Sequence, residues 1–399
     1  MNKWIKGNYW KPAIWLLSLV IIGVLLQFQN LTQTVIIYDK LHAPYYLDST
    51  LTIASSEKLI IKEGTTLIID TGVDIIVHGS MIIKGTEKEP VKLLPKVDTI
   101  GWGRIRLLKP GSHCKFGYAE IIDGTVESTD VNLTYRNVHF TNRQNLPKHF
   151  NITKVVRATA DLQDCSIMGS GTGEGFLLMN MDGATIRNCS FNNIPDAIEI
   201  TRLRNSSISN NLITHVKDDA IDLNNCENVS VDSNIIIHAH DRGVEIGSEI
   251  FGSSKNISIR HNLIVNCKEG ITFKEGSNGS VINNTLYKNK YGIVCQEIVE
   301  GKGGSKVIIE NTIISQSRSK IIETDSLSEV VINYSLSDNG IMNGKGNLSA
   351  RPRFVDPKNN DFYLRKKSPC INAGNPESEV DPDGTRRDIG AYYFDINSD

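Results

Sequence analysis

The stretch that decides the fold is Ile208-Ser209-Asn210-Asn211-Leu212-Ile213, whose pattern returns in Val231-Asp232-Ser233-Asn234-Ile235-Ile236 and in Ile259-Arg260-His261-Asn262-Leu263-Ile264. Similar segments recur over residues 161–336. They align one column of residues, 22 to 28 positions apart: Cys165, Cys189, Asn211, Asn234, Asn262, Asn284 and Asn311. Self-similarity at such a period indicates a solenoid.

Each repeat is built from strands. Short runs rich in Ile and Val end at Asn or Gly, and no segment has the apolar spacing of a helix. A strand that returns one coil later in the same direction makes a parallel sheet, with neighbours stacked about 4.8 Å apart. We expect the Asn column at a sharp bend, because Asn tolerates left-handed backbone and stacked amides can bond from coil to coil. Cys165 and Cys189 should fill the same column as buried thiols.

The Asn column, the Gly/Ala-Ile-x-Ile run after each Asn and the coil length resemble the right-handed parallel β-helix repeat proteins of the pectate-lyase-like superfamily. The resemblance implies an all-β fold, a single-stranded right-handed parallel β-helix over 34–350, with a C-terminal capping segment over 351–399. Residues 39–48 are expected to cover the open edge of the first coil. The superfamily holds lyases, hydrolases, epimerases and non-catalytic binders, so the resemblance implies a fold and no single activity.

An N-terminal segment, residues 1–30, is expected to be a cytoplasmic tail and membrane anchor. Lys3, Lys6 and Lys11 precede an apolar run over 13–28, and no small-x-small cleavage site follows it. The lysines predict a cytoplasmic N-terminus, one transmembrane helix and a body outside the cytoplasm, in the periplasm or at the cell surface. A cleaved signal peptide is the alternative.

Charge and cysteine content exclude some classes of protein. The 43 Lys+Arg nearly balance the 45 Asp+Glu, so no global field favours nucleic acid. The seven Cys lie mostly at strand positions, which favours buried free thiols over a disulfide framework. We expect a monomer that does not bind nucleic acid.

One outward position of the repeat is acidic in three successive coils. In Ala197-Ile198-Glu199-Ile200, Ala220-Ile221-Asp222-Leu223 and Gly243-Val244-Glu245-Ile246 the second and fourth residues are apolar and face inward, so the third points outward. Glu199, Asp222 and Glu245 should therefore stack on one external face. Further polar residues are expected beside them or at their margin: Asp196, Asp218, Asp219, His215, His238, His240, Asp241 and Arg242.

Carboxylates stacked about 4.8 Å apart repel each other unless something offsets the repulsion. A hard cation such as Ca²⁺, held by Glu199, Asp222 and Glu245, is one option. A raised pKa on one carboxyl group is a second, and it would supply an acid and a base for chemistry on sugars. Full solvation is the third, with basic partners nearby: Arg202, Lys217 and Arg242.

The motifs Pro195-Asp196-Ala197-Ile198 and Lys217-Asp218-Asp219-Ala220 resemble successive-coil motifs of polygalacturonase-type glycoside hydrolases. Asp196, Asp218 and Asp219 match the acidic trio of that family, and Lys274 matches its lysine. Arg242 stands where the family has His and Thr272 where it has Arg, so two of its groups are absent. A lyase would need a basic group beside a uronate, and several are available: Lys217, Arg242, Lys268 and Lys274.

These patterns predict recognition of an acidic or neutral polysaccharide along this face, with or without cleavage by a lyase or hydrolase reaction. The residues expected to act in catalysis are Asp196, Asp218, Asp219, Asp222 and Glu245. Those expected to bind substrate are Glu199, His240, Arg242 and Lys274. In an enzyme, the loops 141–153 and 248–255 would wall a groove. The alternative is a non-catalytic cell-surface or envelope-assembly protein with a flat, solvated face.

Overall fold

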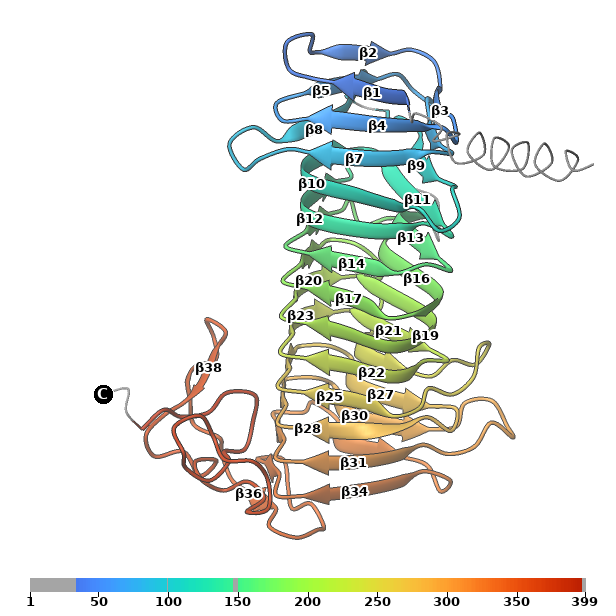
Figure 1. Cartoon of the computed structure of the whole chain (residues 1–399). Coiled ribbons are helices and arrows are strands. Elements are labelled where there is room, and N and C mark those ends of the chain that lie inside the picture. The colour runs from blue at the N-terminus through green and yellow to red at the C-terminus, as the bar shows by residue number, and fades with distance from the viewer. Residues whose placement is uncertain (1–33, 99, 146–149, 397–399) are drawn as a thin grey trace, which may run out of the picture.

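The computed structural model describes residues 34–98, 100–145 and 150–396, which form a tall stack of coils with a further segment at its side (Figure 1). A 36-stranded sheet winds through the stack, and each strand pairs in parallel with its counterpart one coil later. The predicted parallel β-helix is therefore confirmed. The predicted anchor, residues 1–30, lies outside the described residues. The described part of the chain has no helix with the length and apolarity needed to span a bilayer.

Three walls follow one another along the chain. The first wall consists of β1 (Thr34–Tyr38), β4 (Glu57–Lys62), β7 (Ser80–Lys84), β10 (His113–Ile122), β12 (Asn132–Thr141), β14 (Ala160–Gln163), β17 (Ala184–Arg187), β22 (Glu227–Asp232), β25 (Ile257–Arg260), β28 (Asn278–Ile282), β31 (Lys306–Glu310) and β34 (Glu329–Asn333). The second wall consists of β2 (Tyr45–Leu47), β5 (Thr66–Ile69), β8 (Val91–Pro95), β15 (Ser166–Met168), β18 (Ser190–Asn192), β20 (Leu212–Val216), β23 (Ile235–Ala239), β26 (Leu263–Val265), β29 (Thr285–Tyr287), β32 (Ile313–Ser315), β35 (Leu336–Ser337) and β36 (Leu348–Ser349). The third wall consists of β3 (Leu51–Ile53), β6 (Ile75–Val77), β9 (Arg104–Leu107), β11 (Thr125–Thr129), β13 (Asn151–Val156), β16 (Glu174–Asp182), β19 (Ile198–Ser209), β21 (Ile221–Asn224), β24 (Arg242–Ile246), β27 (Glu269–Lys274), β30 (Tyr291–Gln296) and β33 (Lys320–Thr324). Strands β10 and β12 also turn the corner into the second wall, and β19 turns from the third wall into the first.

The interior is filled by apolar columns that alternate with outward side chains along every strand. On the third wall Ile198, Ile221 and Val244 are in register and fully buried. Burial of each such side chain contributes about 1.5–3 kcal/mol to stability, so the repeated columns hold neighbouring coils together. All seven Cys are buried and free, as predicted.

A ladder of asparagine side chains runs along the corner between the first and second walls. Asn211 Nδ2 donates to Asn234 Oδ1 at 2.9 Å, and Asn234 Nδ2 donates to Asn262 Oδ1 at 2.9 Å. Asn262 continues the ladder to Asn284 at 3.0 Å. The predicted amide ladder is confirmed.

The predicted backbone of this ladder needs two corrections. The left-handed bend is taken by the residue before each ladder member: Asn210, Ser233, His261 and Asn283. The ladder side chains are thereby free to point inward. Asn311, the predicted last member, has φ 50° and occupies the bend itself. Thr312 takes the ladder position instead, and its Oγ1 accepts a hydrogen bond from the Asn284 N–H at 3.4 Å.

The ends of the stack also differ from expectation. Residues 39–48 contain β2, which pairs with β5, so this segment belongs to the first coil and does not cover its edge. Tyr38 and Tyr45 pack against the interior there. At the other end, the turn after β35 places Met342 in the core, where it is 8% exposed.

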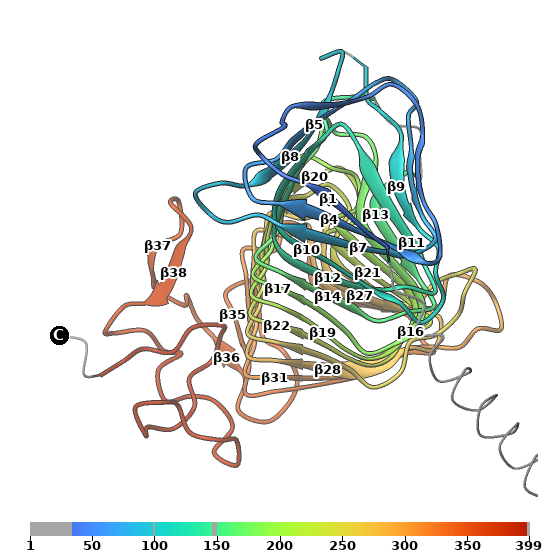
Figure 2. The ribbon, with the colours of Figure 1, turned by 45° about the horizontal axis from the view of Figure 1, so that its top comes forward.

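The C-terminal segment packs on the outside of the second wall, beside the stack instead of under its last coil (Figures 1 and 2). It contains the antiparallel pair β37 (Phe354–Asp356) and β38 (Asp361–Leu364). Phe362 meets Tyr287 of the second wall with ring centroids 5.0 Å apart. The lower coils of this wall carry outward apolar residues that need a cover: Leu263, Val265, Tyr287, Ile313 and Leu336. That apolar surface explains why the segment covers a side wall, where the sequence led us to expect an end cap.

Candidate functional site

The third wall brings together the acidic residues that the sequence predicted to stack. Glu199 pairs in register with Asp222, and Asp222 pairs with Glu245. Their outward direction follows from the buried residues on either side of each one. Leu177 precedes this column and Thr272 follows it, so the acidic run is bounded at both ends.

A second column lies beside the first, because the residue before each Gly or Ala faces the same side of the wall. Its members in successive coils are Glu174, Asp196, Asp219, Arg242 and Glu269. The Asp219 N–H donates to Asp196 Oδ1 at 2.8 Å, and the Arg242 N–H donates to Asp219 Oδ1 at 2.8 Å. Sequence reasoning missed Glu174 and Glu269. The available signal was an acid directly before Gly175 and Gly270, as Asp196 stands before Ala197.

Arg242 neutralises the C-terminal half of these columns. Its Nη1 lies 3.5 Å from Asp219, 3.2 Å from Asp241 and 3.0 Å from Glu245. Its Nε lies 3.2 Å from Glu269 Oε2, which also accepts from the Thr272 hydroxyl at 2.6 Å. The side chains of Asp219 and Glu245 are only 8% and 6% exposed, so this is a buried network and not a solvated surface.

Lys274 adds a second cation at this end. Its Nζ forms an ion pair with Glu245 and lies 2.7 Å from Glu249 Oε1, which comes from the loop 248–255. Burial lowers the pKa of Lys274, and the nearby Arg242 lowers it further. Because Arg242 and Lys274 occupy the Glu245 carboxylate, Glu245 is poorly placed to join Glu199 and Asp222 around a metal ion.

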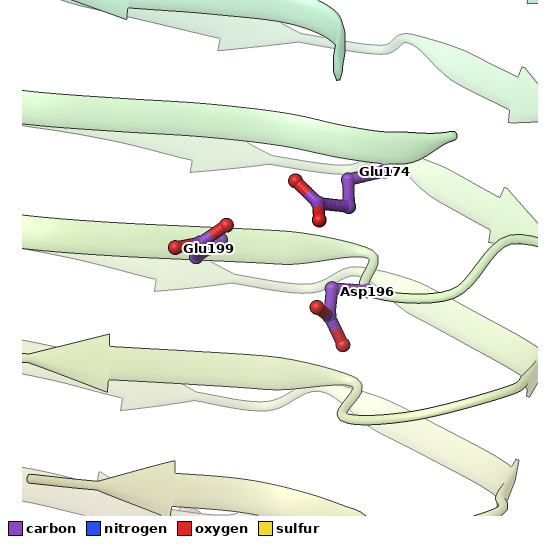
Figure 3. A group of neighbouring side chains, drawn as sticks. All are labelled: Glu174, Asp196 and Glu199. Carbon is purple, nitrogen blue, oxygen red and sulfur yellow. The ribbon is translucent and has the colours of Figure 1, made fainter. Parts of the chain in front are cut away.

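The N-terminal half of the columns is arranged differently. Glu174, Asp196 and Glu199 project from neighbouring coils on the same side (Figure 3). One carboxylate oxygen of each lies within 4.8 Å of the others. Within the described residues, neither Asp196 nor Glu199 forms an ion pair with Arg or Lys. Burial raises the pKa of Asp196 to about 8, and the charges of Asp219, Asp218 and Glu174 add to the shift. Burial beside Glu174 raises the pKa of Glu199 to about 7.

Asp222 and Asp219 link the two halves. Asp222 Oδ2 accepts from Asn224 Nδ2 at 2.6 Å, whereas Oδ1 is buried and has no hydrogen-bond partner among the described residues. Burial raises the pKa of Asp222 well above its usual value, and the charges of Asp219, Glu199 and Asp196 act in the same direction. Burial also raises the pKa of Asp219, but the Arg242 guanidinium opposes this, and the result is about 6.

The remaining predicted residues lie at the edge of the site. Asp218 is exposed, with an oxygen within 4.8 Å of oxygens of Asp196 and Asp219. His240 lines a shallow recess with Lys268, Lys290 and Arg318 at the corner before the third wall. The rings of His215 and His238 lie 5.2 Å apart on the second wall, and so one turn away from the carboxyl columns.

The chemistry of the two halves therefore differs. The half around Arg242 holds carboxyl groups in ion pairs, while the other half holds Asp196 and Glu199, whose pKa values are raised to about 8 and about 7. Of the three basic partners expected for a solvated face, Arg242 pairs with the acids, and Arg202 lies over the Phe251 ring at 5.1 Å.

Comparison with known proteins supports the fold. A family model described as "Right handed beta helix region" matches residues 129–297. No curated protein matches the sequence. Among solved structures, the alginate lyase AlyF-OU02 superposes with a TM-score of 0.55 at 12% identity, over 94% of this chain and 93% of that chain. A mutant of the periplasmic alginate epimerase AlgG gives 0.48 at 13% identity, over 75% and 77%. The catalytic domain of a GH87 alpha-1,3-glucanase gives 0.48 at 13%, over 72% and 67%. At these identities the likeness concerns the fold alone.

Proposed function

We propose that this right-handed parallel β-helix protein binds a polysaccharide along its third wall and cleaves it by acid–base chemistry. One observation carries the proposal: Asp196, which keeps its proton near neutral pH, lies directly beside Asp219, which Arg242 helps to ionise. Cleavage of a glycosidic bond needs a protonated carboxyl group and an ionised one on the same face. The fold shared with an alginate lyase adds support for a polysaccharide substrate.

The residues take different parts in this proposal. Asp196 acts as the general acid, because its pKa of about 8 keeps it protonated at pH 7. Asp219 acts as the base. Asp222, in the neighbouring column of the same wall, shares the charge that develops between Asp196 and Asp219. Arg242, Glu245 and Lys274 hold this arrangement from its C-terminal side. Glu199 binds substrate on the other side.

A second use of the same carboxyl groups is favoured by the convergence of Glu174, Asp196 and Glu199. Three carboxylate oxygens within 4.8 Å of one another suit a hard cation such as Ca²⁺, which takes oxygen ligands and offsets their repulsion. The unpartnered Oδ1 of Asp222 lies in the neighbouring coil. In this form of the proposal the bound cation would neutralise an acidic sugar, and the wall would bind the polymer without Asp196 as an acid.

The test is a screen of the full-length protein against neutral and carboxylated polysaccharides. New reducing ends would report hydrolysis, and new absorbance from an unsaturated product would report elimination. We expect Asp196→Asn to lose activity by about 10²- to 10⁴-fold, the usual contribution of a positioned acid or base. The Asp196→Asn variant should still bind the polysaccharide, as a separate binding measurement would show. A chelator that removes binding in the wild type would select the cation form of the proposal.

The control is Asp182→Asn, which makes the same chemical change at the exposed last residue of β16, eight positions along the strand from Glu174. It should leave cleavage unchanged. The proposal is wrong if no polysaccharide is bound or cleaved, and the acid role is wrong if Asp196→Asn retains full activity while the wild type is active.

The proposal includes a location outside the cytoplasm, where such polymers accumulate, with the body attached through the N-terminal segment. Protease added to spheroplasts should then degrade residues 34–396, whereas protection until the cytoplasmic membrane is lysed would refute this location.

A further inference from the structure

We propose that a recess nearer the N-terminal end of the third wall binds one negatively charged sugar unit of the polysaccharide, carboxylated or sulfated. This inference rests on the proposed function and names the substrate class. The recess has a volume of about 550 Å³ and is lined by the turns that precede β6, β9 and β11 and by the first residues of β9 and β11. The residues on which the argument depends are Trp102, Arg104, Arg106, Gln144 and Phe150.

Three glycines let the residues that line the recess pack closely against one another. A Cβ on Gly124 would lie 2.0 Å from the Trp102 ring, so only glycine allows the indole to lie there. The Trp102 Nε1 group donates to the Ile122 carbonyl at 2.8 Å and fixes the ring. A Cβ on Gly103 would lie 2.0 Å from Asp74 Oδ1, and one on Gly101 would lie 2.7 Å from the Asp123 carbonyl. The motif Gly101-Trp102-Gly103 therefore shapes the recess.

Two guanidinium groups face this space. Arg104 and Arg106 alternate on β9 with the buried Ile105 and Leu107, and their side chains are 38% and 41% exposed. Arg104 lies over the Phe150 ring at 5.0 Å. The Arg106 Nε atom is buried, lies 3.9 Å from Glu127 and has no hydrogen-bond partner among the described residues. The Arg106 side chain as a whole is accessible, so a ligand in the recess can reach it.

Asp74 and Asp123 also line the recess and Glu127 lies beside it, and each of these three acids has a partner. Asp123 is closed off by Arg143, whose Nη2 lies 2.7 Å from it. Asp74 accepts from the Arg104 N–H at 2.8 Å and is thereby held in the loop. Glu127 is shared between the two arginines, and Lys154 in the next coil forms no ion pair within the described chain. Arg104, Arg106 and Lys154 thus lie around the carboxylate of Glu127, whose single charge cannot neutralise all three.

The chemistry of this recess fits an acidic sugar. A guanidinium group forms paired, charge-assisted hydrogen bonds with a planar carboxylate and also binds sulfate. An aromatic ring offers an apolar face against which a sugar ring can pack, with few polar groups fixing its orientation.

The recess is continuous with the acidic columns. The outward residues pair in register from Arg106 to Glu127, Lys154, Leu177 and Glu199. Four coil steps at about 4.8 Å separate Arg106 from Glu199 by roughly 19 Å. A polysaccharide lying along the stack would therefore place an acidic unit at the arginines while a bond several sugars away reaches Asp196. The charged recess would also fix the direction in which the polymer lies.

The experiment compares Arg104→Gln/Arg106→Gln with the wild type on carboxylated, sulfated and neutral polysaccharides of matched length. We expect KM or Kd for an acidic polymer to rise by at least about tenfold, with kcat changed less than twofold, because the recess binds without touching the cleaved bond. The control, Arg260→Gln/Arg351→Gln, removes two exposed arginines elsewhere and should change neither value. Circular dichroism would verify folding of both variants.

The outcomes separate this inference from the proposed function. Loss of affinity confined to carboxylated polymers identifies a carboxylate as the bound group, and loss confined to sulfated polymers identifies a sulfate. If the double variant has an unchanged KM on acidic polymers, or if the wild type cleaves neutral polymers in preference, the recess does not bind an acidic sugar unit. The proposed function is then unaffected. Absence of binding to every polymer overturns both.

Discussion

Two stacked columns of this β-helix use the same coil spacing with opposite results. At the corner between the first and second walls, Asn211, Asn234 and Asn262 stack at hydrogen-bond distance and are at most 1% exposed. On the third wall, Asp196 and Asp219 also stack in adjacent coils and are largely buried. An amide both donates and accepts, so a stack of amides satisfies itself, whereas an ionised carboxylate only accepts.

The comparison shows what a repeated side chain requires of its surroundings. The Asn ladder needs no external partner, and its role is to hold coils together. The carboxyl columns need an Arg, a Lys, a proton or a cation. Where Arg242 and Lys274 are present, the acids form ion pairs with them, and where they are absent the pKa values of Asp196 and Glu199 rise to about 8 and about 7. The reactive groups are therefore expected in the carboxyl columns, whose side chains cannot satisfy one another by hydrogen bonding.

We expect the largest loss of stability when a carboxylate replaces an amide in the asparagine ladder. In Asn234→Asp the new carboxylate would face two acceptors, the Ile208 carbonyl and Asn262 Oδ1, to which the native amide donates at 3.0 and 2.9 Å. Asn234 is fully buried. We expect a loss of about 4 kcal/mol in the free energy of unfolding at pH 7, because a buried charge is left unpaired. Urea denaturation would measure it.

An exposed amide stack provides the control for this substitution. Asn256 Nδ2 donates to Asn228 Oδ1 at 2.7 Å, and Asn228 Nδ2 donates to Asn205 Oδ1 at 3.1 Å on the surface. Asn228→Asp should change stability by less than about 0.5 kcal/mol, since water solvates the charge. Equal losses at Asn234 and Asn228 would mean that burial does not distinguish the two stacks.

A smaller loss is expected when the acid column is deprived of its cation. Arg242→Gln leaves Asp219, Glu245 and Glu269 buried with Lys274 as the remaining cation. We expect a loss of about 3 kcal/mol at pH 7 and a partial recovery at pH 5, where the orphaned acids can take up protons. Thermal unfolding at both pH values would measure it. Arg204→Gln, which breaks only the exposed pair with Glu227, should cost less than about 1 kcal/mol.

The sequence predicted the register of both columns because each depends on a local rule. Alternation fixes which side of a strand faces inward, so Glu199, Asp222 and Glu245 had to align once the period was known. It did not reveal which acid each cation binds, since Arg242 reaches four acids from four different sequence positions. Nor did it place the C-terminal segment, whose contacts with the second wall join residues far apart in the chain and follow no repeat.

The reverse exchange, in which the acid column is given an amide, should stabilise the protein. Asp196→Asn retains the oxygen that accepts the Asp219 N–H and removes the group whose pKa rises from 3.8 to about 8 on folding. A carboxyl group with a raised pKa contributes stability that is fully present below about pH 4 and is lost as the pH rises through about 8. The variant should therefore match the wild type near pH 4 and exceed it by about 2 kcal/mol at pH 8, as measured by thermal unfolding across that range. Asp182→Asn should show no such divergence. If Asp196→Asn instead loses stability more steeply than the wild type toward pH 8, Asp196 is ionised in the native protein, and it stacks on Asp219 only with a bound cation.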